Sequence, residues 1–202
     1  MEGRQYVGRL LDKMSSELVI DGLLFGPEET TMDIKLELLK PIDEEQFVLD
    51  NQAAFNYGAK QYFSEKELEE QHEEEGQIIS RETIIDSIHK DGSITYRILD
   101  GDKKVGGIVL NLKKDFGDLE LFFVIPNQES KGIGQKAWKE VERLHPEIKI
   151  WETVTPYFEK RNIHFYVNKL GFHIVEFFNE FDKDKHIRED LDGMFRFQKK
   201  IK

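Results

Sequence analysis

A pair of glycines and two lysines lie where an apolar stretch gives way to a segment with helical spacing. The sequence VIPNQESKGIGQK holds Gly132 and Gly134 one residue apart, with Lys131 and Lys136 beside them. A helix N-terminus presents unpaired backbone N–H groups and a positive partial charge, and glycine lets an anion approach that backbone closely. The pattern predicts a phosphate or pyrophosphate site, although a plain strand-to-helix turn with a packing glycine explains the two glycines equally well.

Spacing separates this pattern from two other phosphate-binding motifs. A Walker loop requires GxxxxGK[ST], which the sequence lacks. The dinucleotide fingerprint G-x-G-x-x-G/A matches Gly132, Gly134 and Ala137 by letter, and Glu152 lies at a suitable distance downstream. However, Pro126 and five further residues precede Gly132, and the 70 residues that follow it are too few for the paired halves of a Rossmann domain. The dinucleotide interpretation is therefore disfavoured.

Glu120 is a candidate general base, because it interrupts an apolar segment. Strict alternation along a strand places it with Phe122 and Val124 on one face of the sheet. Removal from water would raise the pKa of its carboxyl towards that of a useful base. The alternative is a glutamate near the strand end that reaches solvent or pairs with Lys113 or Lys114.

The elements that must position these residues follow from periodicity and turn signals. Apolar residues at helical spacing predict helices, and alternating or continuous apolar runs predict strands. Thr155-Pro156 is typical of a helix N-cap followed by Pro at the first helical position, and Gly171 of a helix end. Strands are expected at 34–41, 94–112 (a hairpin about Asp100-Gly101-Asp102), 116–126, 148–154, 172–181 and 194–201, and helices at 43–64, 80–92, 131–145 and 155–170.

This order, β-α-α-β-β-β-α-β-α-β-β, predicts a mixed α+β sheet with helices on both faces. Residues 34–202 are expected to form one domain. Residues 1–33 form an N-terminal extension in which 5–25 have helical spacing. Packing on the domain and self-association as a homodimer are both open for this extension.

The composition limits the classes of function. The chain has 202 residues, a net charge of −11 and no cysteine. A nucleic-acid partner, which needs a basic surface, is therefore disfavoured, and thiolate zinc sites are excluded. Six histidines without HExxH-type spacing predict no metal. No apolar run approaches the roughly 20 residues of a membrane span, and charges interrupt the N-terminus where a signal peptide is apolar. A cytoplasmic protein without membrane contact is expected.

From about residue 34 the chain resembles the GNAT superfamily of N-acetyltransferases. The family's pyrophosphate motif [Q/R]-x-x-G-x-[G/A] aligns with residues 129–134, ESKGIG, and a second signature near FYxKLGF aligns with HFYVNKLGF at 164–172. The resemblance implies a central, mostly antiparallel sheet of six to seven strands, splayed between strands four and five. It also implies acetyl-CoA as co-substrate.

The implied reaction transfers an acetyl group from acetyl-CoA to an amine by direct attack in a ternary complex. By resemblance, Glu120 is the general base and Tyr166 approaches the coenzyme sulfur, although Tyr166 also fits a buried helix stripe. Backbone N–H groups near Val124 and Ile125 are implied to stabilise the oxyanion. The acceptor is a small-molecule or peptide amine. The alternative is a non-catalytic acyl-CoA-binding or interaction module on the same fold.

Two positions depart from the family pattern. Glu129 stands where Gln or Arg is usual, with Gln128 before it, and Glu159 stands where many members carry an Asn that contacts coenzyme A, with Asn162 one helical turn later. The resemblance, carried over to this sequence, predicts coenzyme contacts at Phe123, Val124, Ile125, Gln128, Lys131, Gly132, Ile133, Gly134, Gln135, Lys136 and Asn162.

Overall fold

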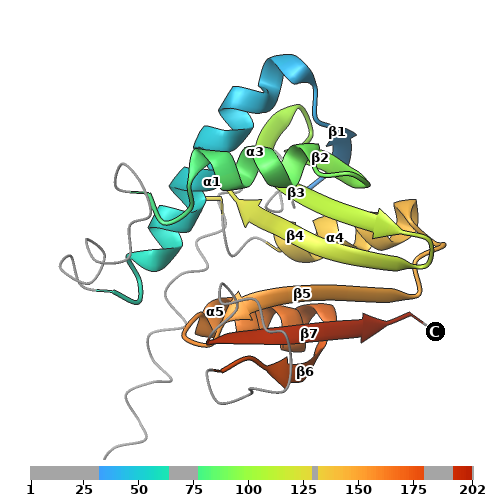
Figure 1. Cartoon of the computed structure of the whole chain (residues 1–202). Helices are drawn as coiled ribbons and strands as arrows, with labels where there is room; N and C mark the ends of the chain where they lie inside the picture. The colour runs from blue at the N-terminus through green and yellow to red at the C-terminus, as the bar shows by residue number, and fades with distance from the viewer. Residues whose placement is uncertain (1–31, 64–76, 129–131, 180–192, 202) are drawn as a thin grey trace, which may run out of the picture. The chain divides into compact units, whose positions relative to one another are not determined.

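A seven-stranded sheet in the order β1-β2-β3-β4-β5-β7-β6 organises the described part of the chain (Figure 1). The computed structural model describes residues 32–63, 77–128, 132–179 and 193–201. The N-terminal extension, residues 1–33, lies almost wholly outside them, so its expected helix stays a prediction. None of the helices in the described ranges is both long and apolar enough to cross a membrane.

The order of helices and strands confirms the expected α+β arrangement. The strands are β1 (Ile34–Leu38), β2 (Ser93–Asp100), β3 (Lys103–Lys113), β4 (Phe116–Val124), β5 (Ile150–Pro156), β6 (His173–Phe177) and β7 (Met194–Lys200). The helices are η1 (Pro41–Asp43), α1 (Glu44–Ala59), α3 (Arg81–His89), α4 (Ile133–Leu144), α5 (Lys160–His164) and η2 (Phe165–Leu170). The left-handed Gly171, with φ 78°, ends η2 as expected.

The predicted start of the helix after β5 is wrong. Thr155 and Pro156 belong to β5, where they pair with Phe195 and Met194 of β7. Pro156 is tolerated because it is the last residue of the strand, where the missing N–H costs little. The helix begins later, at Lys160, with Glu159 as the preceding residue.

The expected splay lies between β4 and β5, the one parallel pair in the sheet. Their register covers only Phe116–Asp118 against Ile150–Glu152, whereas β3 and β4 pair along almost their full length. Just beyond the last paired residues, at the point where the two strands separate (the vertex), the Thr153 hydroxyl donates to the Leu119 carbonyl at 2.9 Å. Beyond that link the two strands diverge, as Figure 1 shows.

A β-bulge in β4 falls at Glu120. Val109 of β3 pairs with Leu121, and the adjacent Leu110 pairs with Leu119, so Glu120 has no partner in the register. A bulge of this kind re-aims the side chains that follow it. Leu119 accordingly belongs to the core cluster beneath α4, while Leu121 belongs to the cluster beneath α1 and α3.

Strict alternation predicted that Glu120 shares a face of the sheet with Phe122 and Val124. This prediction is wrong because of the bulge. Both of those side chains pack against the α4 cluster, whereas the Glu120 carboxylate reaches Lys90, the residue that follows α3.

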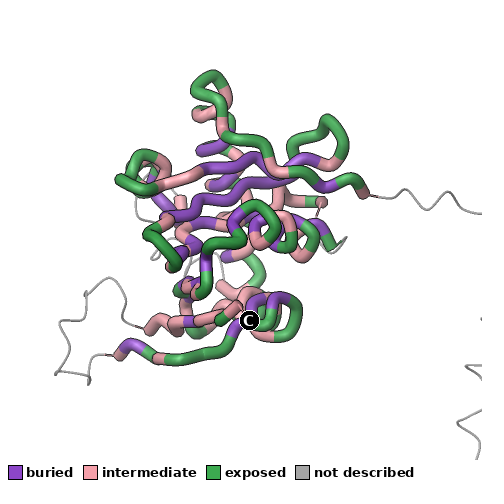
Figure 2. The backbone as a smooth tube through the Cα atoms, turned by 90° about the vertical axis from the view of Figure 1, so that its right-hand side faces the viewer, coloured by how far each residue is buried: buried purple, intermediate pink, exposed green. Residues whose placement is uncertain are grey.

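The two clusters cover opposite faces of the sheet. Trp138 of α4 packs edge-on against Trp151 of β5 at 5.2 Å on one face. On the other face, Phe47 of α1 packs edge-on against Phe123 of β4 at 5.1 Å. Buried residues follow neighbouring strands, and exposed residues occupy connecting turns (Figure 2). The strands that border the splay are thus held from both sides.

Candidate functional site

A cavity of about 1000 Å³ opens where β4 and β5 diverge. Its walls come from β4, β5, the start of α4, the end of α1, and α5 with η2. The predicted site residues that line it are Glu120, Phe123, Val124, Gly132, Ile133, Gly134, Gln135, Asn162 and Tyr166. Segments distant in sequence therefore meet at the place where the sheet hydrogen bonding stops.

The start of α4 forms one end of this cavity. Gly132 is the N-cap residue, with φ 77°, a left-handed conformation that glycine adopts without strain, and as a glycine it has no side chain with which to cap the helix. A Cβ at Gly132 would meet no atom within 4 Å, so there is open space beside the first N–H groups. This arrangement suits an anion.

Gly134 has a packing role in addition to its place in the cavity wall. A Cβ there would lie 2.9 Å from the ring of Phe165, a cavity-lining residue of η2. The packing explanation therefore holds at Gly134, which provides close contact between α4 and η2, whereas Gly132 provides the turn and open space, and the phosphate site stays a prediction.

The backbone of β4 presents amides to the splay, but not at both expected positions. The Ile125 N–H donates to the Val105 carbonyl at 2.9 Å, so its proposed use as an oxyanion donor is wrong. Antiparallel strands alternate hydrogen-bonded and non-hydrogen-bonded pairs. Since Val124 is opposite Gly106, next to that bond, its N–H points away from β3 and towards β5. The backbone N–H of Phe122, two residues earlier in β4, points in the same direction.

Glu120 lines the cavity, and its carboxylate is paired with the Lys90 ammonium at 2.5 Å. The partner is neither Lys113 nor Lys114. The Glu120 side chain is 24% exposed, so solvent or a ligand reaches it. The bulge supplies this position, because it turns Glu120 away from the regular ladder.

Tyr166 is buried, with 8% of its surface exposed, and borders the same cavity. Burial raises the pKa of Tyr166 to about 12; a hydrogen bond with Thr153 lowers it, and the charge of Glu159 raises it further. The phenol is therefore protonated at neutral pH and able to donate a hydrogen bond. Its expected membership of the apolar stripe is also confirmed, since it packs with Phe172 and Phe197.

Asp118 lies at the vertex but does not line the cavity. Burial, followed by the charges of Glu152 and Glu120, raises the pKa of Asp118 to about 6, while Lys90 lowers it. Asp118 and Glu152 are register partners on adjacent strands. Of the three carboxyl groups, Glu120 pairs with Lys90 and Glu152 with Arg196.

An aromatic wall faces the β4 side of the cavity. Phe63 and Phe158 pack edge-on at 4.8 Å, and the hydroxyl of Tyr62 accepts from the Arg161 N–H at 2.9 Å. Tyr62 thereby ties the end of α1 to the start of α5. These residues carry no motif, and only the fold brings them to the site.

Four of the predicted coenzyme residues are placed differently from the others. Ile125, Gln128 and Lys136 are not among the lining residues, and the Lys136 ammonium donates instead to the Met32 carbonyl at 3.3 Å. Lys131 lies outside the described residues, as does Glu129.

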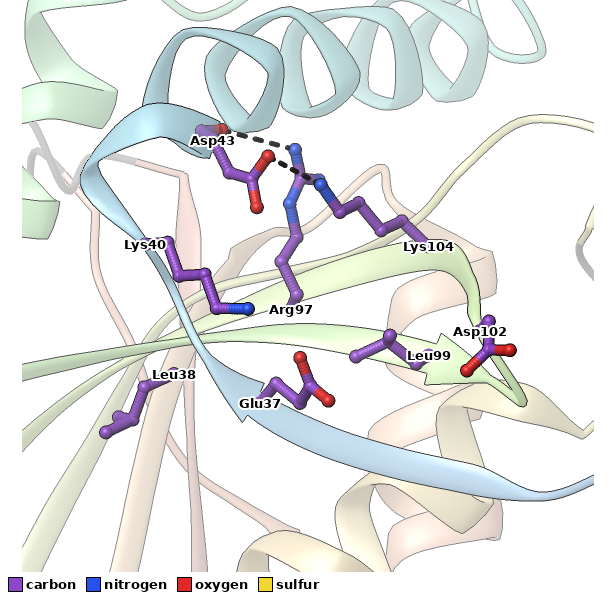
Figure 3. Close-up of a pocket in the computed structure, with 8 residues that line it drawn as sticks. All are labelled: Glu37, Leu38, Lys40, Asp43, Arg97, Leu99, Asp102 and Lys104. Atoms are coloured by element: carbon purple, nitrogen blue, oxygen red, sulfur yellow. Dashed lines mark hydrogen bonds and ion pairs between the residues drawn. The ribbon is translucent and has the colours of Figure 1, made fainter.

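A second pocket, of about 270 Å³, lies beside the start of α1 (Figure 3). The Arg97 guanidinium pairs with Asp50 at 2.7 Å, and the Lys104 ammonium pairs with Asp43 at 2.5 Å. Figure 3 shows Arg97 and Lys104 reaching towards Asp43. Cations and carboxylates balance among its lining residues, so the pocket is explained by ion pairs that fix α1 on the sheet: Glu37, Leu38, Lys40, Asp43, Arg97, Leu99, Asp102 and Lys104.

The model of the acetyltransferase (GNAT) family matches residues 55–172, more than half of the chain. The chain belongs to the GNAT acetyltransferase family. The matched segment runs from α1 to the end of η2 and contains the whole splay, so the family resemblance and the observed cavity coincide.

Relatives of this GNAT protein include the Bacillus subtilis (strain 168) protein YrkN, which is 42% identical over 83% of this chain and 93% of YrkN. Solved structures share the fold at low identity. The PaiA N-acetyltransferase of Thermoplasma acidophilum, in complex with coenzyme A, has a TM-score of 0.61 at 18% identity, covering 84% of this chain and all of that one. The spermidine N-acetyltransferase of Vibrio cholerae, in complex with coenzyme A and spermine, has a TM-score of 0.55 at 14% identity, covering 83% and 95%.

Proposed function

We propose that this protein is an acetyl-CoA-dependent N-acetyltransferase acting on a primary amine. One observation carries the proposal: the cavity at the β4–β5 splay joins a helix N-terminus that begins at a glycine, a solvent-accessible carboxylate and a protonated phenol. Membership of the GNAT family supports the reaction class. The coenzyme seen in the Thermoplasma acidophilum and Vibrio cholerae structures supports the co-substrate.

The residues present fit coenzyme A. Open space beside Gly132, together with the first N–H groups of α4, is suited to a pyrophosphate. The Val124 N–H, directed towards β5, is suited to an extended amide-containing arm, which adds to a strand edge as a peptide does. Lys169 and Arg161 line the same cavity and contribute positive charge.

Acetyl-CoA, when bound, supplies an activated thioester carbonyl. Glu120 accepts a proton from the acceptor ammonium, directly or through one water, so that the amine can attack. The new C–N bond replaces the C–S bond, and Tyr166 donates a hydrogen bond to the departing sulfur. Lys90 pairs with Glu120 at 2.5 Å, so an ion pair holds that carboxylate at the cavity wall before the amine arrives.

The acceptor is a small-molecule or peptide amine. The PaiA and spermidine enzymes show that the same fold accommodates amine chemistry in other proteins. In this chain the described acceptor wall is aromatic, with Tyr62, Phe63 and Phe158. That wall supports an amine whose carbon skeleton packs against rings.

Thiol release from acetyl-CoA, measured across a panel of primary amines, tests the proposal. The chain contains no cysteine and contributes no background thiol. Amine-dependent release that Glu120→Gln lowers supports the enzyme. Tight binding of coenzyme A without release for any amine supports instead the non-catalytic acyl-CoA-binding module.

A further inference from the structure

Glu159 is a carboxyl in the cavity wall that the proposed chemistry does not use. It immediately precedes α5, at a position where acidic side chains often cap a helix. Its side chain makes no capping hydrogen bond. It lines the splay cavity instead.

The surroundings disfavour a negative charge at Glu159. Burial raises the pKa of the Glu159 carboxyl, and only the charge of Arg161 opposes this. Ionisable groups from several of the surrounding elements line the same cavity. They are Arg161 and His164 of α5, Tyr166 and Lys169 of η2, Glu120 of β4, and Tyr62 beyond α1, with Tyr157 beside Glu159 itself.

Glu159 and Tyr166 line the same cavity, on the side formed by α5 and η2. The ionised carboxylate raises the pKa of the buried Tyr166 phenol. A charge that perturbs Tyr166 also acts on any ligand lying along the splay between β4 and β5, since both side chains line that space.

Building on the proposed function, we propose that Glu159 must take up a proton for coenzyme A to bind in this cavity. The coenzyme is a polyanion with a pyrophosphate and a further phosphate, so an ionised Glu159 repels it. A protonated carboxyl removes that repulsion and becomes a hydrogen-bond donor to an amide carbonyl of the ligand. Glu159 therefore makes coenzyme affinity depend on pH.

The direction of the pH dependence follows from the thermodynamic coupling between proton binding and coenzyme binding. The coenzyme favours the neutral carboxyl, so binding raises the pKa of Glu159 above its value in the free protein. Protons are then taken up on binding at pH values between the free and bound pKa. Affinity weakens as pH rises through this window, by up to about tenfold for each unit of pKa difference between the two states.

Isothermal titration calorimetry with dephospho-coenzyme A tests this coupling. The dephospho form lacks the 3′-phosphate, whose own ionisation near pH 6 would add a second proton signal. Titrations in two buffers of different ionisation enthalpy, from about pH 5 to about pH 8, give the number of protons taken up. The protein variants are wild type, Glu159→Gln, Glu159→Asn, His164→Gln and the surface control Glu82→Gln, which lies outside the cavity.

We expect wild type, Glu82→Gln and His164→Gln to take up protons on binding and to lose affinity as pH rises. Glu159→Gln and Glu159→Asn should bind without this uptake, with a dissociation constant nearly independent of pH and tighter than wild type at the alkaline end. Two different Glu159 variants are used so that the misfolding of one does not decide the result.

Binding to wild type without proton uptake overturns the inference and leaves the proposed function standing. The same holds if uptake persists in both Glu159 variants, or disappears in His164→Gln. Failure of wild type to bind the coenzyme at any pH refutes the proposed function, and the inference with it.

Discussion

Replacing Tyr166 with Phe tests the proposed leaving-group role with a very small change. The variant deletes one hydroxyl from a side chain that is 8% exposed and keeps the ring that packs against Phe172 and Phe197. Thr153 keeps its hydrogen bond to the Leu119 carbonyl, so the vertex between β4 and β5 retains its link. A loss of activity then reports on the hydroxyl.

The size of the effect follows from the pKa of about 12 for Tyr166. An ordinary thiol has a pKa near 8.5, so full transfer of the phenolic proton to the departing sulfur is uphill by about 3.5 units, or ~5 kcal/mol. Tyr166 therefore donates a hydrogen bond and keeps its proton. A hydrogen bond to a charged group contributes about 1.5–3 kcal/mol, so we expect kcat to fall about 10- to 150-fold with little change in coenzyme affinity.

Steady-state thiol release and calorimetric binding of coenzyme A measure the two quantities. Tyr96→Phe is a matched control, because Tyr96 is also 8% exposed and its hydroxyl bonds to His145 outside the cavity. A kcat within threefold of that control contradicts the role of Tyr166. An alkaline limb near pH 8–9 that vanishes in Tyr166→Phe would show proton transfer, against the reasoning from its pKa.

Three further predictions follow from the same site. Glu120→Gln should lower kcat/KM by about 10²- to 10⁴-fold because it removes the proposed base. Lys90→Met should leave coenzyme binding unchanged. Equal activity of Glu120→Gln and wild type in the thiol-release assay removes Glu120 from the mechanism. Gly134→Ala should lower the melting temperature and weaken coenzyme binding together, since its Cβ would lie 2.9 Å from Phe165; an unchanged melting temperature shows that Phe165 yields. In denaturant titrations, Asp118→Asn should stabilise the protein by about 1–3 kcal/mol near pH 8 and by nothing near pH 4. The Asp118 pKa of about 6 lies above its unfolded value, so the ionisation of Asp118 destabilises the folded state as pH rises through that range. A gain in stability that persists at pH 4 contradicts this origin.

Local sequence signals predicted the elements that depend on local chemistry. The turn at Asp100-Gly101 and the left-handed Gly171 lie where glycine and hairpin patterns place them. The spacing of apolar residues also predicted α4, whose buried residues include Trp138 and Val141. Each of these features is determined by residues within one or two turns of one another.

The features that define the site depend on contacts between distant residues. The bulge at Glu120 arises from how β4 registers with β3, which alternation within β4 alone does not reveal. The Lys90–Glu120 pair joins residues 30 apart in sequence, and the Ile125–Val105 bond closes a ladder that only the sheet defines. Thr155-Pro156 gave a wrong prediction of a helix start because the same dipeptide suits both a helix start and a strand end.

Thr153 connects the shape of the sheet to the chemistry of the cavity. Where parallel pairing stops, the Leu119 carbonyl would lack a partner from β5, and the Thr153 hydroxyl occupies it at 2.9 Å. The same side chain also acts on Tyr166, because Thr153 lowers the pKa of the phenol that burial raises. Because Thr153 is 6% exposed, its hydroxyl has little solvent to replace the Leu119 carbonyl. Thr153 therefore links the end of the β4–β5 ladder to the electrostatic surroundings of Tyr166, a phenol that lines the cavity where the strands diverge.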